Sequence, residues 1–262
     1  MRCRRDHAPR RQQRGQPERF SRSRGRCGTS LMENQHITVG QLIFSLVFPL
    51  LFPIAMLFLG GDWLWMAGWM WGAWFVLLCW GTTLYLYFKD PGLLKERFQP
   101  LKTTNQKKGA AYLIYLISVV FLAWIAIMPL DAKRCMWTTH FPMWLRIAGG
   151  IALLLSAYFI FRALADNSFA SPLIRIQTER QQTVASTGVY GFVRHPMYLG
   201  ALLLFLGTPL LLGSFYGTMI GLVLIFLLAL RTLGEEEMLV NELEGYTEYK
   251  KKVKYRLIPF LW

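Results

Sequence analysis

Charged residues are scarce in this 262-residue sequence, since Asp, Glu, Lys and Arg together make up only 17% of it. A soluble domain contains about 25% charged residues. Hydrophobic residues make up 54% of the chain, and they fall into long runs with almost no charge. Such runs are typical of a chain that crosses a bilayer several times, and they exclude an ordinary soluble domain.

Cysteine is also scarce, with four residues in the whole chain. Cys3, Cys27, Cys79 and Cys135 form neither a C-x-x-C pair nor a metal-ligand spacing. We therefore predict no disulfide and no metal site.

Apolar residues are nearly absent from residues 1–31, which contain ten arginines and two acidic residues. This segment cannot bury a core and has no hydrophobic stretch of a secretory signal. We predict a disordered Arg-rich tail or a start codon assigned too early, with Met32 as the more ordinary beginning. The net charge of +14 arises largely here. No basic patch interleaves with aromatic residues of a soluble surface, so we expect no nucleic acid partner.

Six apolar segments approach the ~20 residues that a membrane-spanning helix needs. We expect these spans at about 42–59, 64–88, 110–130, 144–165, 197–213 and 218–231. The last two are short and separated only by Ser214 to Gly217, which predicts a tight helical hairpin; a single bent element there would give five spans. The predicted fold class is all-α, a polytopic membrane helical bundle of about six spans.

Lysine and arginine gather in the loops of one side of the predicted bundle, at residues 89–109, 166–195 and 231–262. The opposite side carries only Lys133, Arg134 and Arg146 between its spans. Because cytoplasmic loops are enriched in basic residues, six spans would place both termini in the cytoplasm.

The segment after the last span has an apolar residue every three or four positions, at Leu239, Leu243, Tyr246, Tyr249 and Val253. This spacing predicts a C-terminal cytoplasmic amphipathic helix. The acids of residues 235–237 would lie at its start and four lysines near its end, as the helix dipole favours.

Polar residues form a first cluster within residues 182–200, directly before the fifth span. Arg194 and His195 lie at the mouth of an apolar helix, where ionisable residues are functional candidates. Pro196 suits the first turn of that helix. A purely structural interpretation remains open, in which Arg194 is an interfacial anchor, His195 an N-cap and Tyr198 a membrane-belt aromatic.

A second polar cluster follows the sixth span, where Arg231 and Glu235 are spaced to share one helix face. Alone it could be an interfacial arginine followed by a solvated acidic turn. Antiparallel pairing of the last two spans, however, brings residues 190–198 beside residues 228–236. The two clusters then predict a pocket at the cytoplasmic edge of the membrane.

Four fragments of the last third resemble a known family. They are GVY at 188–190 followed by RHPMY at 194–198, Arg231 followed by Glu235 and Glu236, the pair Tyr246 and Tyr249, and RLIP at 256–259. In order and spacing they resemble the isoprenylcysteine carboxyl methyltransferase family, which belongs with bacterial membrane methyltransferases and phospholipid methyltransferases. The resemblance covers about residues 170–262.

The resemblance implies a methyltransferase that uses S-adenosyl-L-methionine. It implies that cofactor-binding residues are Gln182, Thr183, Val184, Ala185, Tyr190, His195, Pro196, Met197, Tyr198 and Glu235. It also implies that Arg231 and Arg194 are catalytic residues at the methyl acceptor. Gln182 stands where some members of the family have His, so its contact is the least secure.

The expected acceptor is lipophilic or membrane-associated, such as the carboxylate of a prenylated cysteine, and membrane lipid is an expected partner. The resemblance further implies a bacterial inner membrane and three regions: residues 1–31, a four-span region 32–165, and a methyltransferase-like region 166–262. A phospholipid N-methyltransferase, an NADPH-dependent sterol or polyprenyl reductase and a non-enzymatic membrane protein remain alternatives. Pro196 and Met197 argue against the reductases, which usually have an R-H-x-N-Y pattern. The oligomeric state stays open.

Overall fold

The computed structural model describes residues 37–98, 108–171, 175–259 and 261–262. The segment 1–31, predicted as a tail or an early start, lies outside them. Within the described residues every regular element is a helix, which confirms the all-α fold class. The α-helices are α2 (Val39–Val47), α3 (Leu51–Gly60), α4 (Met66–Lys89), α5 (Pro91–Glu96), α6 (Lys108–Pro129), α7 (Met143–Ala165), α8 (Pro196–Leu212), α9 (Phe215–Glu242) and α10 (Tyr246–Lys252).

Five helical segments are long and apolar enough to cross a membrane, namely Val39–Gly60, Met66–Lys89, Tyr112–Arg134, Met143–Ala165 and Phe215–Glu242. Large apolar side chains on their outer faces are exposed, among them Leu77, Leu122, Leu154 and Phe226. Such extensive apolar exposure fits contact with lipid. The sixth predicted span, α8, is an apolar helix of 17 residues, or about 26 Å, slightly less than a bilayer core of ~30 Å.

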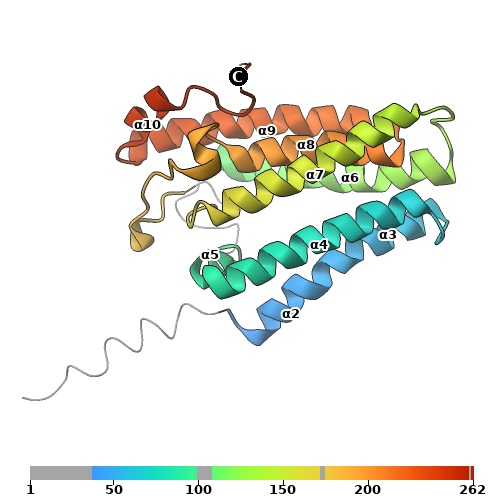
Figure 1. Ribbon diagram of the computed structural model, residues 1–262, viewed down its shortest axis with the longest axis horizontal. Coiled ribbons are helices and arrows are strands. Elements are labelled where there is room, and N and C mark those ends of the chain that lie inside the picture. The colour runs from blue at the N-terminus through green and yellow to red at the C-terminus, as the bar shows by residue number, and fades with distance from the viewer. Residues whose placement is uncertain (1–36, 99–107, 172–174, 260) are drawn as a thin grey trace, which may run out of the picture. The chain divides into compact units, whose positions relative to one another are not determined.

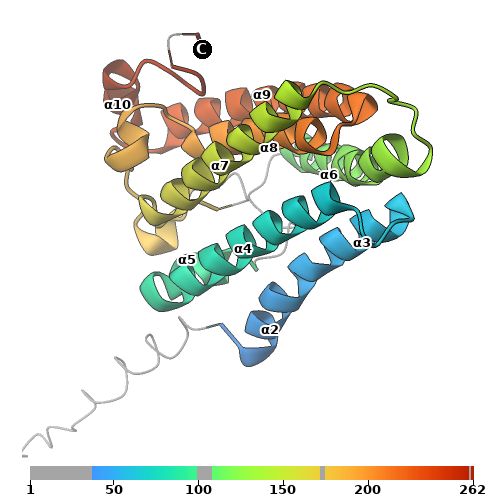
Figure 2. The ribbon, with the colours of Figure 1, turned by 45° about the vertical axis from the view of Figure 1, so that its right-hand side comes forward.

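Helices α7, α8 and α9 lie side by side, while α2, α3 and α4 group together (Figures 1 and 2). The contact between α7 and α8 depends on glycine. A Cβ added at Gly149 would lie 2.4 Å from the backbone nitrogen of Leu211, and one at Gly207 would lie 2.9 Å from the Gly149 carbonyl oxygen. Small residues allow this close backbone approach between membrane helices.

One end of the bundle is fastened by Asp131, whose side chain is fully buried. Its carboxylate accepts hydrogen bonds from the Ser214 hydroxyl (2.6 Å), the Tyr216 amide (3.2 Å) and both the amide and the hydroxyl of Thr138. The Ser214 hydroxyl also caps α9 by accepting from the Gly217 amide. Asp131 therefore ties the α6–α7 connection to the hairpin between α8 and α9.

The predicted C-terminal amphipathic helix is wrong as a single element. The acids at 235–237 do not begin a new helix, because α9 continues without interruption to Glu242. At 28 residues, α9 is about 42 Å long and exceeds the bilayer core of ~30 Å by about two turns. The break comes at Gly245, which adopts a left-handed φ of 81° before α10. The predicted apolar residues still cluster, with Leu243, Tyr246, Tyr249 and Val253 buried together.

Candidate functional site

A cavity opens at the end of the bundle where α7 ends and α8 begins; we call this the pocket end. Eleven of the twelve predicted site residues line it: Gln182, Thr183, Val184, Ala185, Tyr190, Arg194, His195, Met197, Tyr198, Arg231 and Glu235. The twelfth, Pro196, is not part of the lining; it is buried as the first residue of α8. The hairpin of α8 and α9 thus brings the two polar clusters together, as the sequence predicts.

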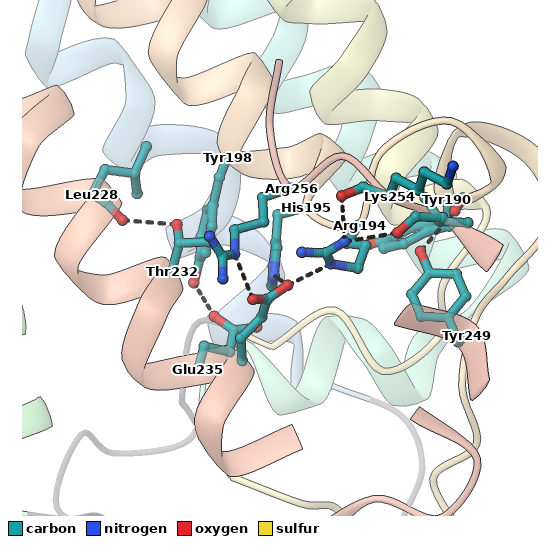
Figure 3. Close-up of polar contacts among 12 residues, drawn as sticks. Tyr190, Arg194, His195, Tyr198, Leu228, Thr232, Glu235, Tyr249, Lys254 and Arg256 are labelled. Atoms are coloured by element: carbon teal, nitrogen blue, oxygen red, sulfur yellow. Dashed lines mark hydrogen bonds and ion pairs between the residues drawn. The ribbon is translucent and has the colours of Figure 1, made fainter. Parts of the chain in front are cut away.

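Tyr198 joins Arg231 and Glu235, the two charged side chains of α9 that line the cavity. Figure 3 shows its contact with Glu235. The Nε of Arg231 donates to the Tyr198 hydroxyl at 2.9 Å, and this hydroxyl donates in turn to the Glu235 carboxylate. The Arg231 guanidinium also lies over the Tyr198 ring, 5.9 Å from its centroid. On the other side, the His195 and Tyr198 rings stack with centroids 5.6 Å apart. The arrangement fixes a cation, a carboxylate and two aromatic faces around one space.

Arg194 has a different environment from Arg231. Its Nε donates to the buried carboxylate of Glu236, and its Nη1 donates to the carbonyl oxygens of Val253 (2.7 Å) and Lys254 (2.8 Å). Glu236 also accepts from the Nε of Arg256 at 2.6 Å. The Arg194 side chain is only 4% exposed, so this predicted catalytic residue lines the cavity while its guanidinium holds the chain after α10.

Three tyrosines close the cavity opposite Glu235. The Tyr249 hydroxyl donates to the Tyr190 carbonyl oxygen at 2.7 Å, and the Tyr190 hydroxyl reaches the Ala163 carbonyl at 3.3 Å. Burial raises the pKa of Tyr190, Tyr246 and Tyr249, so these phenols stay protonated and can donate hydrogen bonds. The family resemblance includes Tyr246 and Tyr249 but gives them no role. The sequence analysis therefore did not predict that these two tyrosines line the cavity.

The turn that carries Tyr190 depends on Gly188. This residue has a φ of 59°, and a Cβ there would lie 2.0 Å from a carboxylate oxygen of Asp166. The same oxygen accepts from the Val189 amide at 3.0 Å. Gly188 thus allows the turn to close on the end of α7 and sets the position of Tyr190.

The wall formed by residues 175–185 is held partly by α5, a helix that the sequence analysis did not predict. Glu96 of α5 is 5% exposed and accepts from the Nε (3.1 Å) and Nη2 (2.8 Å) of Arg175, which lines the cavity. The backbone amide of the buried Gln177 donates to the Gln182 side-chain oxygen at 2.8 Å. The Gln182 side chain therefore has a partner inside the wall as well as a place in the lining.

Two buried polar atoms of the lining have no hydrogen-bond partner among the described residues: the His195 Nε2 and the Tyr246 hydroxyl. The His195 Nε2 lies 3.8 Å from the Glu236 carboxylate, beyond hydrogen-bond reach. Buried polar groups are nearly always satisfied, and those that are not indicate an absent partner. A polar ligand in the cavity would supply one.

Comparison with known proteins found similarity to methyltransferases in the last part of the chain. Residues 144–244 match the phospholipid methyltransferase family. Over 91 residues the chain is 36% identical to the protein-S-isoprenylcysteine O-methyltransferase of Schizosaccharomyces pombe, an alignment that covers 34% of this chain and 38% of that relative. The segment from α7 to the end of α9 is therefore similar to these methyltransferases, which supports the family predicted by resemblance.

Proposed function

We propose that this protein is a membrane methyltransferase that uses S-adenosyl-L-methionine to methylate a carboxylate on a lipophilic acceptor, such as a prenylated cysteine. The observation that carries the proposal is the cavity at the pocket end, which Glu235 lines together with two buried polar atoms that have no hydrogen-bond partner among the described residues. The family match of residues 144–244 supports methyl transfer over the reductase alternative.

The residues of the cavity fit the chemical groups of this cofactor. The Glu235 carboxylate would pair with its ammonium group, since charge-assisted hydrogen bonds are the strongest of their kind. The His195 Nε2 and the Tyr246 hydroxyl would bind its other polar groups. The faces of Tyr190 and Tyr198 would attract the positively charged sulfur. When bound, the cofactor supplies an electrophilic methyl group on that sulfur.

On the acceptor side, Arg231 would hold the carboxylate. A guanidinium matches a carboxylate in bidentate geometry, and Tyr198 keeps Arg231 oriented through its hydroxyl. A carboxylate acceptor needs no proton removed before it attacks. Positioning and exclusion of water would therefore supply most of the rate acceleration.

Arg194 would act as a positioning residue rather than at the acceptor. Its guanidinium donates to Glu236 and to two carbonyl oxygens after α10. These bonds hold the chain end that closes one side of the site.

The basic loops at the pocket end favour a cytoplasmic location for the cavity. With α8 counted as a short span, both termini would lie in the cytoplasm, and a bacterial inner membrane stays a prediction. The division into a region 32–165 and a methyltransferase-like region 166–262 stays a prediction.

Cofactor binding tests the first part of the proposal. We expect Glu235→Gln to weaken S-adenosylmethionine binding at least tenfold in calorimetry of detergent-purified protein, because a hydrogen bond to a charged group contributes ~1.5–3 kcal/mol. Glu237→Gln is the matched control, since Glu237 is exposed on the same helix and does not line the cavity. Binding of NADPH in place of S-adenosylmethionine would refute the methyltransferase.

The acceptor requires a separate experiment, because the matched family is described as phospholipid methyltransferase. Radiolabelled methyl transfer would be compared between a farnesylated cysteine and phosphatidylethanolamine. A carboxyl methyl ester releases methanol in alkali, whereas a methylated amine is stable. Alkali-labile product on the cysteine supports the proposal; alkali-stable product on the lipid establishes the phospholipid N-methyltransferase instead.

A further inference from the structure

The chain after α10 returns to the start of α8. The Arg194 amide donates to the Tyr255 carbonyl and the His195 amide to the Arg256 carbonyl, both at 3.0 Å. Pro196 then begins the apolar helix. With α8 counted as a short span, as proposed above, Tyr255 and Arg256 would lie at the depth where hydrocarbon gives way to lipid headgroups.

A second cleft, distinct from the cofactor cavity, lies along this returning chain. It is lined by Lys250, Lys254, Arg256, Leu261 and Trp262, with Tyr255 and Arg194 at its base. The Arg256 guanidinium lies over the Trp262 ring, 5.3 Å from the centroid, and Leu261 is 77% exposed. Three cations thus adjoin an indole and an exposed apolar side chain.

We propose that this cleft binds the phosphate headgroup of an anionic phospholipid. Basic residues beside a membrane attract anionic headgroups, and tryptophan is enriched at this depth. The exposed Leu261 beside the cations favours a ligand with an acyl chain over a free phosphate ion. The buried Glu236 carboxylate pairs with Arg194 and Arg256, but no acidic residue among those described is part of the cleft lining, which therefore keeps a positive charge.

The headgroup site is linked to the cofactor cavity through Arg194, which lines both. Arg256 shares the Glu236 carboxylate with Arg194. A phosphate held by Lys250, Lys254 and Arg256 therefore strengthens the attachment of the returning chain beside α8.

Native mass spectrometry of detergent-solubilised full-length protein tests this site. The protein is mixed with equal amounts of phosphatidylglycerol and phosphatidylcholine of the same acyl chains. We expect it to retain phosphatidylglycerol preferentially, and Lys250→Gln/Lys254→Gln to reduce that preference more than tenfold, since each lysine near an anionic surface changes affinity about fivefold. Lys251→Gln/Lys252→Gln removes the same charge from exposed positions of α10 outside the cleft and leaves the preference unchanged.

Three outcomes would overturn the proposal. The wild-type protein could show no preference for phosphatidylglycerol. Both double variants could lose the preference equally, which would assign the effect to general charge. Soluble glycerophosphoglycerol could displace the lipid at equal concentration, which would identify the ligand as a free phosphate ester. All three readouts are independent of methyl transfer.

Discussion

Tyr198 is the residue on which both charged groups of the cavity depend. Its single hydroxyl accepts from Arg231 and donates to Glu235. If Glu235 binds the cofactor and Arg231 the acceptor, this hydroxyl fixes the position of one reactant relative to the other.

Tyr198→Phe removes that hydroxyl and keeps the ring. We expect kcat to fall about 10- to 100-fold, because two hydrogen bonds to charged groups of ~1.5 kcal/mol or more are lost, while the protein still folds. Methyl transfer and thermal melting would be measured together. Tyr158→Phe, on the exposed face of α7, is the control; an equal loss of activity there would contradict the role of Tyr198.

Sequence reasoning predicted the residues of the cavity better than their partners. Arg231, Glu235 and His195 were found because polar residues at the end of an apolar helix are costly and conspicuous. Tyr198 was found only through the family resemblance. The role of Arg194 in holding the chain after α10 was not predicted, because two of its acceptors are carbonyl oxygens. Every residue has a carbonyl oxygen, so no sequence pattern indicates which one will be used.

At the scale of elements, the turn at residues 188–191 depends on one glycine. Gly188→Ala would add a Cβ at a left-handed φ and against the Asp166 carboxylate. We expect the free energy of unfolding to fall by at least ~1–2 kcal/mol from the backbone conformation alone. We also expect weaker S-adenosylmethionine binding, because Tyr190 shifts.

Gly191→Ala is the matched control for the glycine prediction. A Cβ there would meet its nearest atom at 3.6 Å, an ordinary contact, and its φ is not left-handed. Gly188→Ala should have a lower melting temperature and weaker S-adenosylmethionine binding than Gly191→Ala, as measured by thermal melting and cofactor titration. Equal behaviour would mean that the turn tolerates a side chain at Gly188.

The opposite end of the bundle depends on the carboxylate of Asp131. Asp131→Asn replaces one accepting oxygen with an amide donor that faces existing donors. We therefore expect the free energy of unfolding to fall by ~1–3 kcal/mol and the melting temperature in detergent to be lower. Asp62→Asn is the control, since Asp62 forms a partly exposed ion pair with Lys133 and such pairs contribute little. A melting temperature unchanged in Asp131→Asn would show that the network does not stabilise the hairpin.

The helices were predictable where the bilayer dictates them and less so elsewhere. A spanning helix must be apolar over its length, so hydropathy identified the five segments that are long enough to cross a membrane and also the shorter apolar helix α8. Outside the membrane, the same apolar spacing suited one long helix or two shorter ones. Helix α9 continues through the acids at 235–237, and a new helix, α10, begins after Gly245. Helix α5 is short and half polar, so it had no hydropathy signal.

At the scale of the whole described chain, the cavity is not built by the family segment alone. Residues 144–244 match the methyltransferase family, yet Glu96 of α5 holds Arg175 in the cavity wall. Helix α5 therefore helps to shape a site whose recognisable residues all lie later in the sequence.

A double-mutant cycle tests this contribution. We expect Glu96→Gln and Arg175→Gln each to weaken S-adenosylmethionine binding about fivefold or more, because each leaves a poorly exposed charge without its partner. The double variant should be little worse than either single one, since the two changes remove the same interaction. Strictly additive losses in calorimetry would show that the two residues act separately.

The contacts between Arg194 and the carbonyl oxygens of Val253 and Lys254 have a consequence for sequence variation. These bonds use the main chain, so they are indifferent to the side chains at positions 253 and 254. Related proteins can therefore change side chains here without losing these two hydrogen bonds, as long as the buried position 253 stays apolar. A comparison of sequences would then detect the arginine but not the segment that it holds.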